Sequence, residues 1–187
     1  MSDPRIAGFG LDPLFADKLV KLLDACHGEG LTFKVAQGLR TPQTQALYYC
    51  QWDQRSPADI GAQADKLEAD GAPWTADLMR SYAKTKRQKA WQTSQLPGSG
   101  WHQWGEAADC YCYKDGVMVG NGDDPCYKTY ADLAQKIGLT AGYYFSHPDP
   151  GHVQLRPEAG ATSLYNWTYI DQTMMARFSA KPALAVA

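Results

Sequence analysis

The chain has 187 residues, of which 44% are apolar, 20% charged and 12% aromatic. This composition is typical of a globular protein with one sizeable core, and it excludes collagen, coiled coils and disordered chains. Eighteen basic against twenty acidic side chains leave a net charge of −2, which removes the basic excess typical of nucleic-acid-binding proteins. We therefore predict one domain over residues 1–187, a monomer with no nucleic-acid partner.

The first residues, 1–8, contain no basic segment followed by an apolar stretch, so we expect no secretory signal peptide. No apolar run approaches the roughly 18–20 residues that span a bilayer, and no stable membrane insertion is expected. The five cysteines are an odd number without the spacing of a small disulfide scaffold. We expect them to be buried, reduced thiols in a chain made in the cytoplasm.

The N-terminal half of the sequence favours helices. An Asp-Pro pair and a Thr-Pro pair each predict a helix start, the first before residues 13–26 and the second before residues 42–52. Between them, alternation of polar and apolar residues predicts a strand over 32–36. The Asp-, Ala-, Gly- and Pro-rich stretch 53–73 is expected to be a loop with a short helix, and residues 74–91 to be helical.

Short strands predominate after the Pro-Gly-Ser-Gly loop at residues 97–100. The pattern predicts strands over residues 107–113, 117–119, 143–145 and 152–155. An Asp-Gly pair predicts a hairpin turn between the first two of them. Further helices are predicted after Asp124-Pro125 and over about 163–178. This order predicts an α+β fold in which several helices pack on a small antiparallel sheet.

Few side chains in the sequence can form a histidine-based site. Asp109 lies in an apolar strand, where an unpaired carboxylate would be costly to bury, so it needs a cation, a cluster of donors or a metal. His102 precedes it, and His152 opens a later strand. Two imidazoles and a carboxylate from different strands of the small sheet are the ligands of a catalytic zinc site, with Asp149 placed to act as a general base. The alternative is that each histidine is a hydrogen-bonded structural residue.

Three separate motifs carry a family resemblance over residues 30–155. The stretch from His102 to Asp109, H-Q-W-G-E-A-A-D, followed by D-P-G-H ending at His152, closely resembles the zinc peptidases of the D-Ala-D-Ala carboxypeptidase/L-Ala-D-Glu endopeptidase family. Their pattern is S-x-H-x-x-G-x-A-x-D followed by D/E-x-x-H. Upstream, G-L-R-T-P-Q-T-Q-A-L-Y at residues 38–48 resembles the segment G-[YF]-R-[ST]-x-x-x-Q-x-x-L-Y. One departure is Gly100, which occupies the position of the family's serine.

The resemblance assigns roles to particular residues. It implies that His102, Asp109 and His152 bind Zn²⁺, which polarises the scissile carbonyl and lowers the pKa of a bound water. Asp149 would take a proton from that water, and Arg40 would donate hydrogen bonds to the oxyanion. Four further residues are candidate substrate contacts: Gln45, Ser99, Trp101 and His147. For Gln45 the alternative is a solvated side chain, and for Trp101 a place in the core or a lid.

The resemblance also implies a function. Within this family, small proteins without a signal peptide resemble phage endolysins, which cut peptidoglycan stem peptides between L-Ala and D-Glu. Such a protein would be made in the host cytoplasm and act on the cell wall after release. The alternatives are a D-Ala-D-Ala carboxypeptidase with the same chemistry, and a zinc-stabilised wall-binding module without catalysis.

Overall fold

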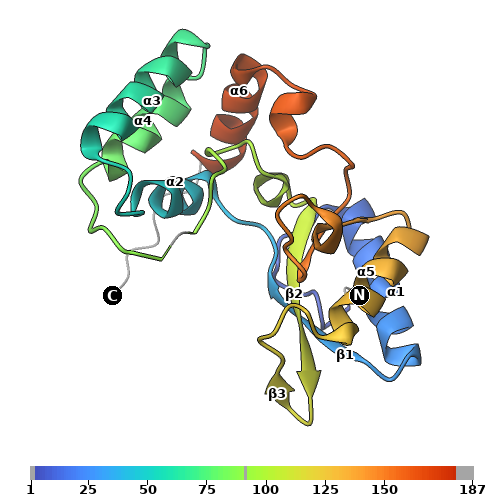
Figure 1. Cartoon of the computed structure of the whole chain (residues 1–187). Helices are drawn as coiled ribbons and strands as arrows, with labels where there is room; N and C mark the ends of the chain where they lie inside the picture. Colours follow the sequence, from blue (N-terminus) through green and yellow to red (C-terminus); the bar gives the residue numbers. More distant parts are fainter. Residues whose placement is uncertain (1–2, 91, 180–187) are drawn as a thin grey trace, which may run out of the picture. The chain divides into compact units, whose positions relative to one another are not determined.

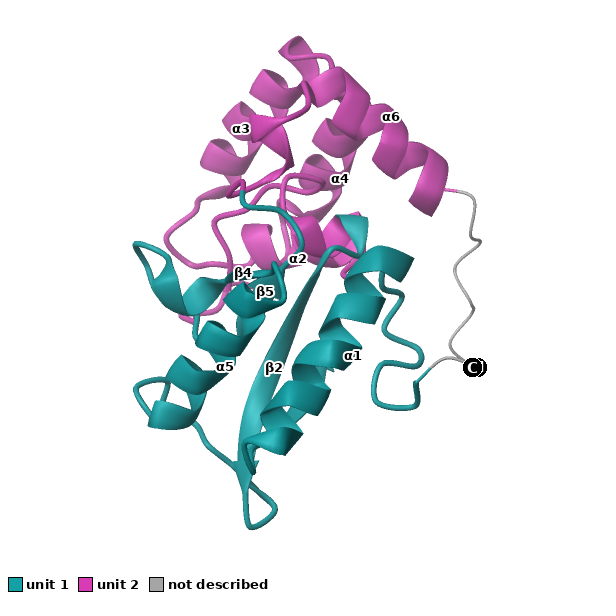
Figure 2. Cartoon of the chain, turned by 90° about the vertical axis from the view of Figure 1, so that its right-hand side faces the viewer, with its two compact units in different colours: residues 1–39, 104–157 teal, residues 40–103, 158–187 magenta. Residues whose placement is uncertain are grey.

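The computed structural model describes residues 3–90 and 92–179 (Figure 1). It divides the chain into two compact units, one formed by residues 1–39 and 104–157 and the other by residues 40–103 and 158–187 (Figure 2). Each unit combines two separate stretches of sequence, and the single domain over 1–187 stays a prediction. None of the described helices has the length and apolar character needed to cross a bilayer.

The first unit contains the sheet, whose strand order is β1-β2-β5-β4, with β3 paired to β2. All its pairings are antiparallel. The strands are β1 (Thr32–Gln37), β2 (Ala107–Lys114), β3 (Val117–Met118), β4 (Thr140–Ala141) and β5 (His152–Gln154). Asp115 and Gly116 between β2 and β3 both have positive φ, +50° and +80°, as a two-residue hairpin turn requires. The predicted α+β fold with a small antiparallel sheet is confirmed.

Two helices, α1 (Pro13–Gly28) and α5 (Pro125–Lys136), pack on the sheet and lie alongside β2 in Figure 2. Both begin as predicted, because an aspartate side chain accepts hydrogen bonds from the first free backbone N–H groups: Asp12 from Leu14 and Phe15, and Asp124 from Cys126. Alternate residues of β2 face this core, and the side chains between them, Asp109 among them, project from the opposite face.

The second unit is helical. It contains α2 (Pro42–Cys50), α3 (Pro57–Ala69), α4 (Pro73–Tyr82), the 3₁₀ helix η3 (Ala161–Ser163) and α6 (Trp167–Phe178). Its core combines residues of α2, α3 and α4, including Ala46, Ile60 and Met79, which are fully buried. No side chain from its own N-terminus caps α4. Instead Asp171 of α6, 3% exposed, accepts from the N–H of Thr75 at 2.7 Å and of Trp74 at 3.3 Å.

The largest difference from the sequence prediction is at residues 53–73, where the expected loop with a short helix is mostly the thirteen-residue helix α3, Pro57–Ala69. Ser56 and Asp59 form a reciprocal capping box at its start. Ile60, Ala64 and Leu67 then recur at helical spacing and are fully buried. The small side chains of this segment therefore belong to a packed helix.

Three further predicted elements differ from those in the structure. The helix predicted over 74–91 ends at Tyr82, and Gln88 instead forms a bridge with Trp52; residue 91 lies outside the described residues. Residues 143–145 are not a strand, because Gly142–Tyr144 form the 3₁₀ helix η2. The last helix begins at residue 167, after its cap Asn166, and not at about 163.

Candidate metal centre

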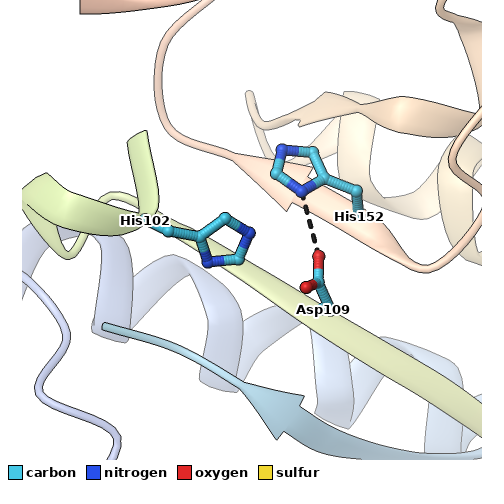
Figure 3. A group of neighbouring side chains, drawn as sticks. All are labelled: His102, Asp109 and His152. Atoms are coloured by element: carbon cyan, nitrogen blue, oxygen red, sulfur yellow. Dashed lines mark hydrogen bonds and ion pairs between the residues drawn. The ribbon is translucent and has the colours of Figure 1, made fainter. Parts of the chain in front are cut away.

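The structure brings His102, Asp109 and His152 together. Asp109 of β2 and His152 of β5 are directly opposite each other in the strand register. His102 lies in the 3₁₀ helix η1 (Trp101–Trp104), and not in a strand. The three side chains point toward one another (Figure 3), and each offers one ligand atom within 4.8 Å of the others. Two of the three predicted ligands are thus carried by the sheet.

His152 is held by hydrogen bonds on both ring nitrogens. Its Nδ1 lies 3.0 Å from Oδ1 of Asp109, and its Nε2 lies 3.0 Å from Oε1 of Gln154. Burial lowers the pKa of this imidazole, but the hydrogen bond and charge of Asp109, together with the charge of Asp149, outweigh it and raise the pKa above its usual value. The pair is therefore arranged to hold a positive charge, either a proton or a cation.

The donor set fits a zinc ion. Zn²⁺ takes imidazole nitrogens and carboxylate oxygens, and catalytic sites use three protein ligands while leaving one position open. His102 and His152 are 8% and 9% exposed, which limits competition from bulk water, and Asp109 supplies the negative charge that offsets the cation. Among the described residues, no fourth histidine, cysteine or acidic side chain completes this group. Three protein ligands is the number that catalytic zinc sites use.

Asp149 lies in the turn that leads into β5. Its backbone N–H donates to the carbonyl of Gly142 at 2.9 Å, and its own carbonyl accepts from the N–H of His152 at 3.0 Å. Gly142 permits this approach, since a Cβ there would lie 2.5 Å from the Asp149 carbonyl oxygen. The carboxylate is exposed and near enough to raise the pKa of His152. This position suits the predicted general base, a role that stays a prediction.

Arg40 is anchored at both its backbone and its side chain. Its N–H donates to the carbonyl of His102 at 3.2 Å, and its Nη1 donates to Oε1 of Gln45 at 3.0 Å. Its guanidinium also lies 5.3 Å from the ring centroid of Tyr48. These contacts tie the start of α2 to the turn that carries a metal ligand. The predicted oxyanion contact of Arg40 stays a prediction.

Gln45 is 1% exposed, so it is not a solvated side chain. Its Oε1 accepts from Arg40 and from Nε2 of Gln103, and its Nε2 donates to Oγ1 of Thr93 and the carbonyl of Gln95. These four hydrogen bonds use the full capacity of a primary amide. Gln45 thus holds Arg40 and Gln103, and its predicted substrate contact stays a prediction.

The remaining predicted substrate contacts differ in exposure. Ser99 is buried and donates to the carbonyl of Leu96 at 2.8 Å. Trp101 is 2% exposed, and its indole N–H donates to the carbonyl of Glu158 at 2.7 Å, which places it in the core and not in a lid. His147 is exposed, with Nδ1 3.4 Å from the Ser146 hydroxyl. Their contacts with substrate stay predictions.

Two residues near the site were missed by the sequence analysis. Gln154 follows His152 by two residues on β5, and Tyr111 follows Asp109 by two residues on β2. The two-residue period of a strand puts each beside its metal-ligating neighbour on one face of the sheet. The same periodicity, applied outward from the two predicted ligands, could have identified both.

A partly buried His-Asp-His group beside an exposed carboxylate is typical of zinc-dependent hydrolases. The sequence matches the family described as VanY, D-alanyl-D-alanine carboxypeptidase, over residues 9–157. The chain belongs to this family and is a zinc peptidase that acts on peptidoglycan. The predicted family and zinc cofactor are confirmed. No curated protein matches the sequence.

Similar solved structures include three proteins of low sequence identity. The D,D-pentapeptidase VanY from a VanB-type resistance cassette, in complex with Zn(II), has 20% identity and a TM-score of 0.44, with 77% of this chain and 71% of that chain covered. The L-Ala D-Glu endopeptidase ChiX of Serratia marcescens has 16% identity and a TM-score of 0.41, covering 79% and 81%. The LD-carboxypeptidase LdcB has 18% identity and a TM-score of 0.44, covering 87% and 64%.

Proposed function

We propose that this protein is an L-alanyl-D-glutamate endopeptidase that cleaves peptidoglycan stem peptides as a phage endolysin. The observation that carries the choice of bond is a hollow of about 370 Å³ beside Asp149. Asp149 is the only charged residue in its lining. The others are uncharged: Tyr111, Met118, Val119, Gly120, Gly122, Tyr127, Pro150 and Gly151.

A hollow whose single charged side chain is a carboxylate favours an internal bond over a chain end. A carboxypeptidase must accommodate the terminal carboxylate of its substrate, and an anion that loses water without a cationic partner is costly to bind. The negative charge of Asp149 would also repel the terminal carboxylate of such a substrate. A stem peptide that continues through the hollow carries its C-terminal carboxylate farther from Asp149, and the free carboxylate that D-Glu itself retains would have to lie on the side away from the hollow.

The position of the family's serine differs in this chain. Gly100 offers no hydroxyl there, and the hydroxyl of the neighbouring Ser99 is engaged by the carbonyl of Leu96 and by Gln95. A side chain at Gly100 would also approach Oε1 of Gln103, since a Cβ would lie 3.3 Å from that atom. The site therefore has one fewer donor than the family pattern provides, and because carboxypeptidases and endopeptidases share that pattern, this position does not distinguish the two bonds.

Each residue of the site has a separate role in the proposed hydrolysis. His102, Asp109 and His152 would hold a zinc ion, which would supply the Lewis acid for polarising the scissile carbonyl and activating water. Asp149 accepts the proton of the attacking water and returns it to the leaving amine. Arg40, held by its hydrogen bond to Gln45, donates to the carbonyl oxygen as negative charge develops there.

The cysteines support synthesis in the host cytoplasm before release to the wall. All five are buried as free thiols, an arrangement typical of proteins that fold in a reducing compartment. An endolysin is expected to fold in the host cytoplasm and to reach peptidoglycan only after its release. We infer no nucleic-acid partner and a monomeric state for this role.

The test is product analysis by mass spectrometry after digestion of purified peptidoglycan with the zinc-loaded protein. We expect stem peptides that begin with D-Glu, together with glycan strands that retain L-Ala. Loss of a single terminal D-Ala would instead establish the carboxypeptidase. If the zinc-loaded protein binds peptidoglycan and releases nothing, the wall-binding module is correct. Asp149→Asn serves as the matched control, because it leaves the three metal ligands in place.

A further inference from the structure

Gln154 contacts the metal ligand His152 through a side chain whose orientation is fixed. The two residues are separated by one position on β5, so both project from the same face of the sheet. Gln154 is 3% exposed. Its Nε2 donates to the carbonyl of Arg156 at 2.7 Å, and its Oε1 lies 3.0 Å from Nε2 of His152. A carbonyl oxygen can only accept, so the amide NH₂ group must face Arg156, and Oε1 must face the imidazole.

The carbonyl of Arg156, which fixes the orientation of the Gln154 amide, is itself held in place. The guanidinium of Arg156 forms a two-pronged ion pair with Glu106, with Nε 2.6 Å from Oε2 and Nη2 3.2 Å from Oε1. The N–H of Leu155 donates to the carbonyl of Glu106 at 2.8 Å. The segment after β5 is thus fastened to the residue that precedes β2. The Gln154 amide cannot turn over without breaking its bond to this anchored carbonyl.

The orientation of the Gln154 amide determines which imidazole nitrogen carries a proton. Because Oε1 accepts, Nε2 of His152 must be the donor. A neutral imidazole has one N–H, so its lone pair is then on Nδ1, the nitrogen that lies 3.0 Å from Oδ1 of Asp109. Two electron-rich atoms at this distance require either a second proton or a metal ion that both residues bind. A metal ion bound to both atoms meets that requirement.

We propose that Gln154 is a positioning residue that holds His152 in the Nε2–H tautomer and so reserves Nδ1 for the metal ion shared with Asp109. Partners of this kind orient ligating histidines and raise their basicity, and their removal typically costs about 10–100-fold in metal affinity. The inference rests on the metal centre of the proposed peptidase and not on the bond that it cleaves.

The first experiment measures zinc affinity by competition with a chelator, with circular dichroism to follow folding. We expect Gln154→Met to bind zinc about 10–100-fold more weakly than the unaltered protein. Gln154→Glu still presents an acceptor to Nε2 and should recover most of the lost affinity. Val153→Ala is the matched control. Val153 lies between the two residues but faces the core, fully buried, so this change weakens the fold without touching the amide.

The second experiment reads the tautomer directly by ¹⁵N NMR of the zinc-loaded protein with labelled histidines. We expect His152 to carry its proton on Nε2 and to bind zinc through Nδ1. A proton on Nδ1 would overturn the proposal, as would a Gln154→Met protein that binds zinc as tightly as Val153→Ala. If Gln154→Met does not fold, the spectrum of the unaltered protein decides. Neither measurement uses peptidoglycan, so failure of the endopeptidase assay and failure of this inference are distinguishable.

Discussion

Replacing Gln45 by methionine tests whether this residue positions the site or contacts substrate. Methionine has a similar size but no amide, so all four hydrogen bonds of Gln45 are lost. Two of the four partners, Thr93 and Gln103, are 6% and 1% exposed, and water cannot readily replace what they lose. An unsatisfied buried polar group costs about 1–3 kcal/mol. We therefore expect the free energy of unfolding to fall by about 1–3 kcal/mol, the cost of the Gln103 amide, because the Thr93 hydroxyl still accepts from the N–H of Gln95.

The measurement is urea denaturation of the zinc-loaded protein, with turnover on peptidoglycan measured below the transition. Arg40 loses its partner in the same variant, so turnover should fall while zinc stays bound. Gln135→Met, an exposed glutamine on α5, is the control and should change stability by less than about 0.5 kcal/mol. A Gln45→Met protein with unchanged stability and a raised KM would show that Gln45 contacts substrate and refute its structural role.

Three further predictions follow from the site and its supports. Asp149→Asn should retain stoichiometric zinc by elemental analysis yet lose about 10²–10⁴ in kcat, the usual contribution of a general base; loss of zinc would make Asp149 a ligand. Because Asp109 raises the pKa of His152, protons should compete with zinc at higher pH than for an ordinary histidine. Apparent zinc affinity, measured by chelator competition, should therefore fall as pH decreases between about 8 and 5, and an affinity that does not change with pH would contradict this. The zinc-free protein should instead lose stability as pH rises through the pKa of His152. Asp171→Ala removes the cap of α4 and should lower the melting temperature, at a cost of about 1–3 kcal/mol, with Asp171→Asn milder; equal stability of all three proteins would show that the cap contributes nothing.

Helix starts can be predicted from local sequence signals, whereas several element ends depend on tertiary contacts. Asp12 and Asp124 cap helices through atoms two or three residues away, so the sequence suffices to place them. The capping box of α3 was equally local, but its segment was interpreted from composition alone. By contrast, α4 ends at Tyr82, and Gln88 in the segment after it bridges to Trp52, a contact that no local pattern reveals.

The candidate site shows the same division between local and distant information. The ligands were predicted from motif resemblance, because the pairing of Asp109 with His152 across 43 positions of sequence is set by strand register. The burial of Gln45 could not be predicted, since a glutamine on a short helix is usually solvated. Only the packed structure shows that its amide joins four separate partners.

Because all five thiols are buried, their alkylation can report local unfolding within each of the two units. Burial raises the pKa of Cys26 to about 12 and of Cys50 to about 11, so at neutral pH about one thiol in 10⁴–10⁵ is ionised and reactive in the folded state. Alkylation must therefore wait for local unfolding. Cys50 is the single cysteine of the helical unit, and the other four belong to the unit with the sheet. The time course of alkylation, resolved by peptide mass, would thus report the opening rate of each unit separately in one unmodified chain.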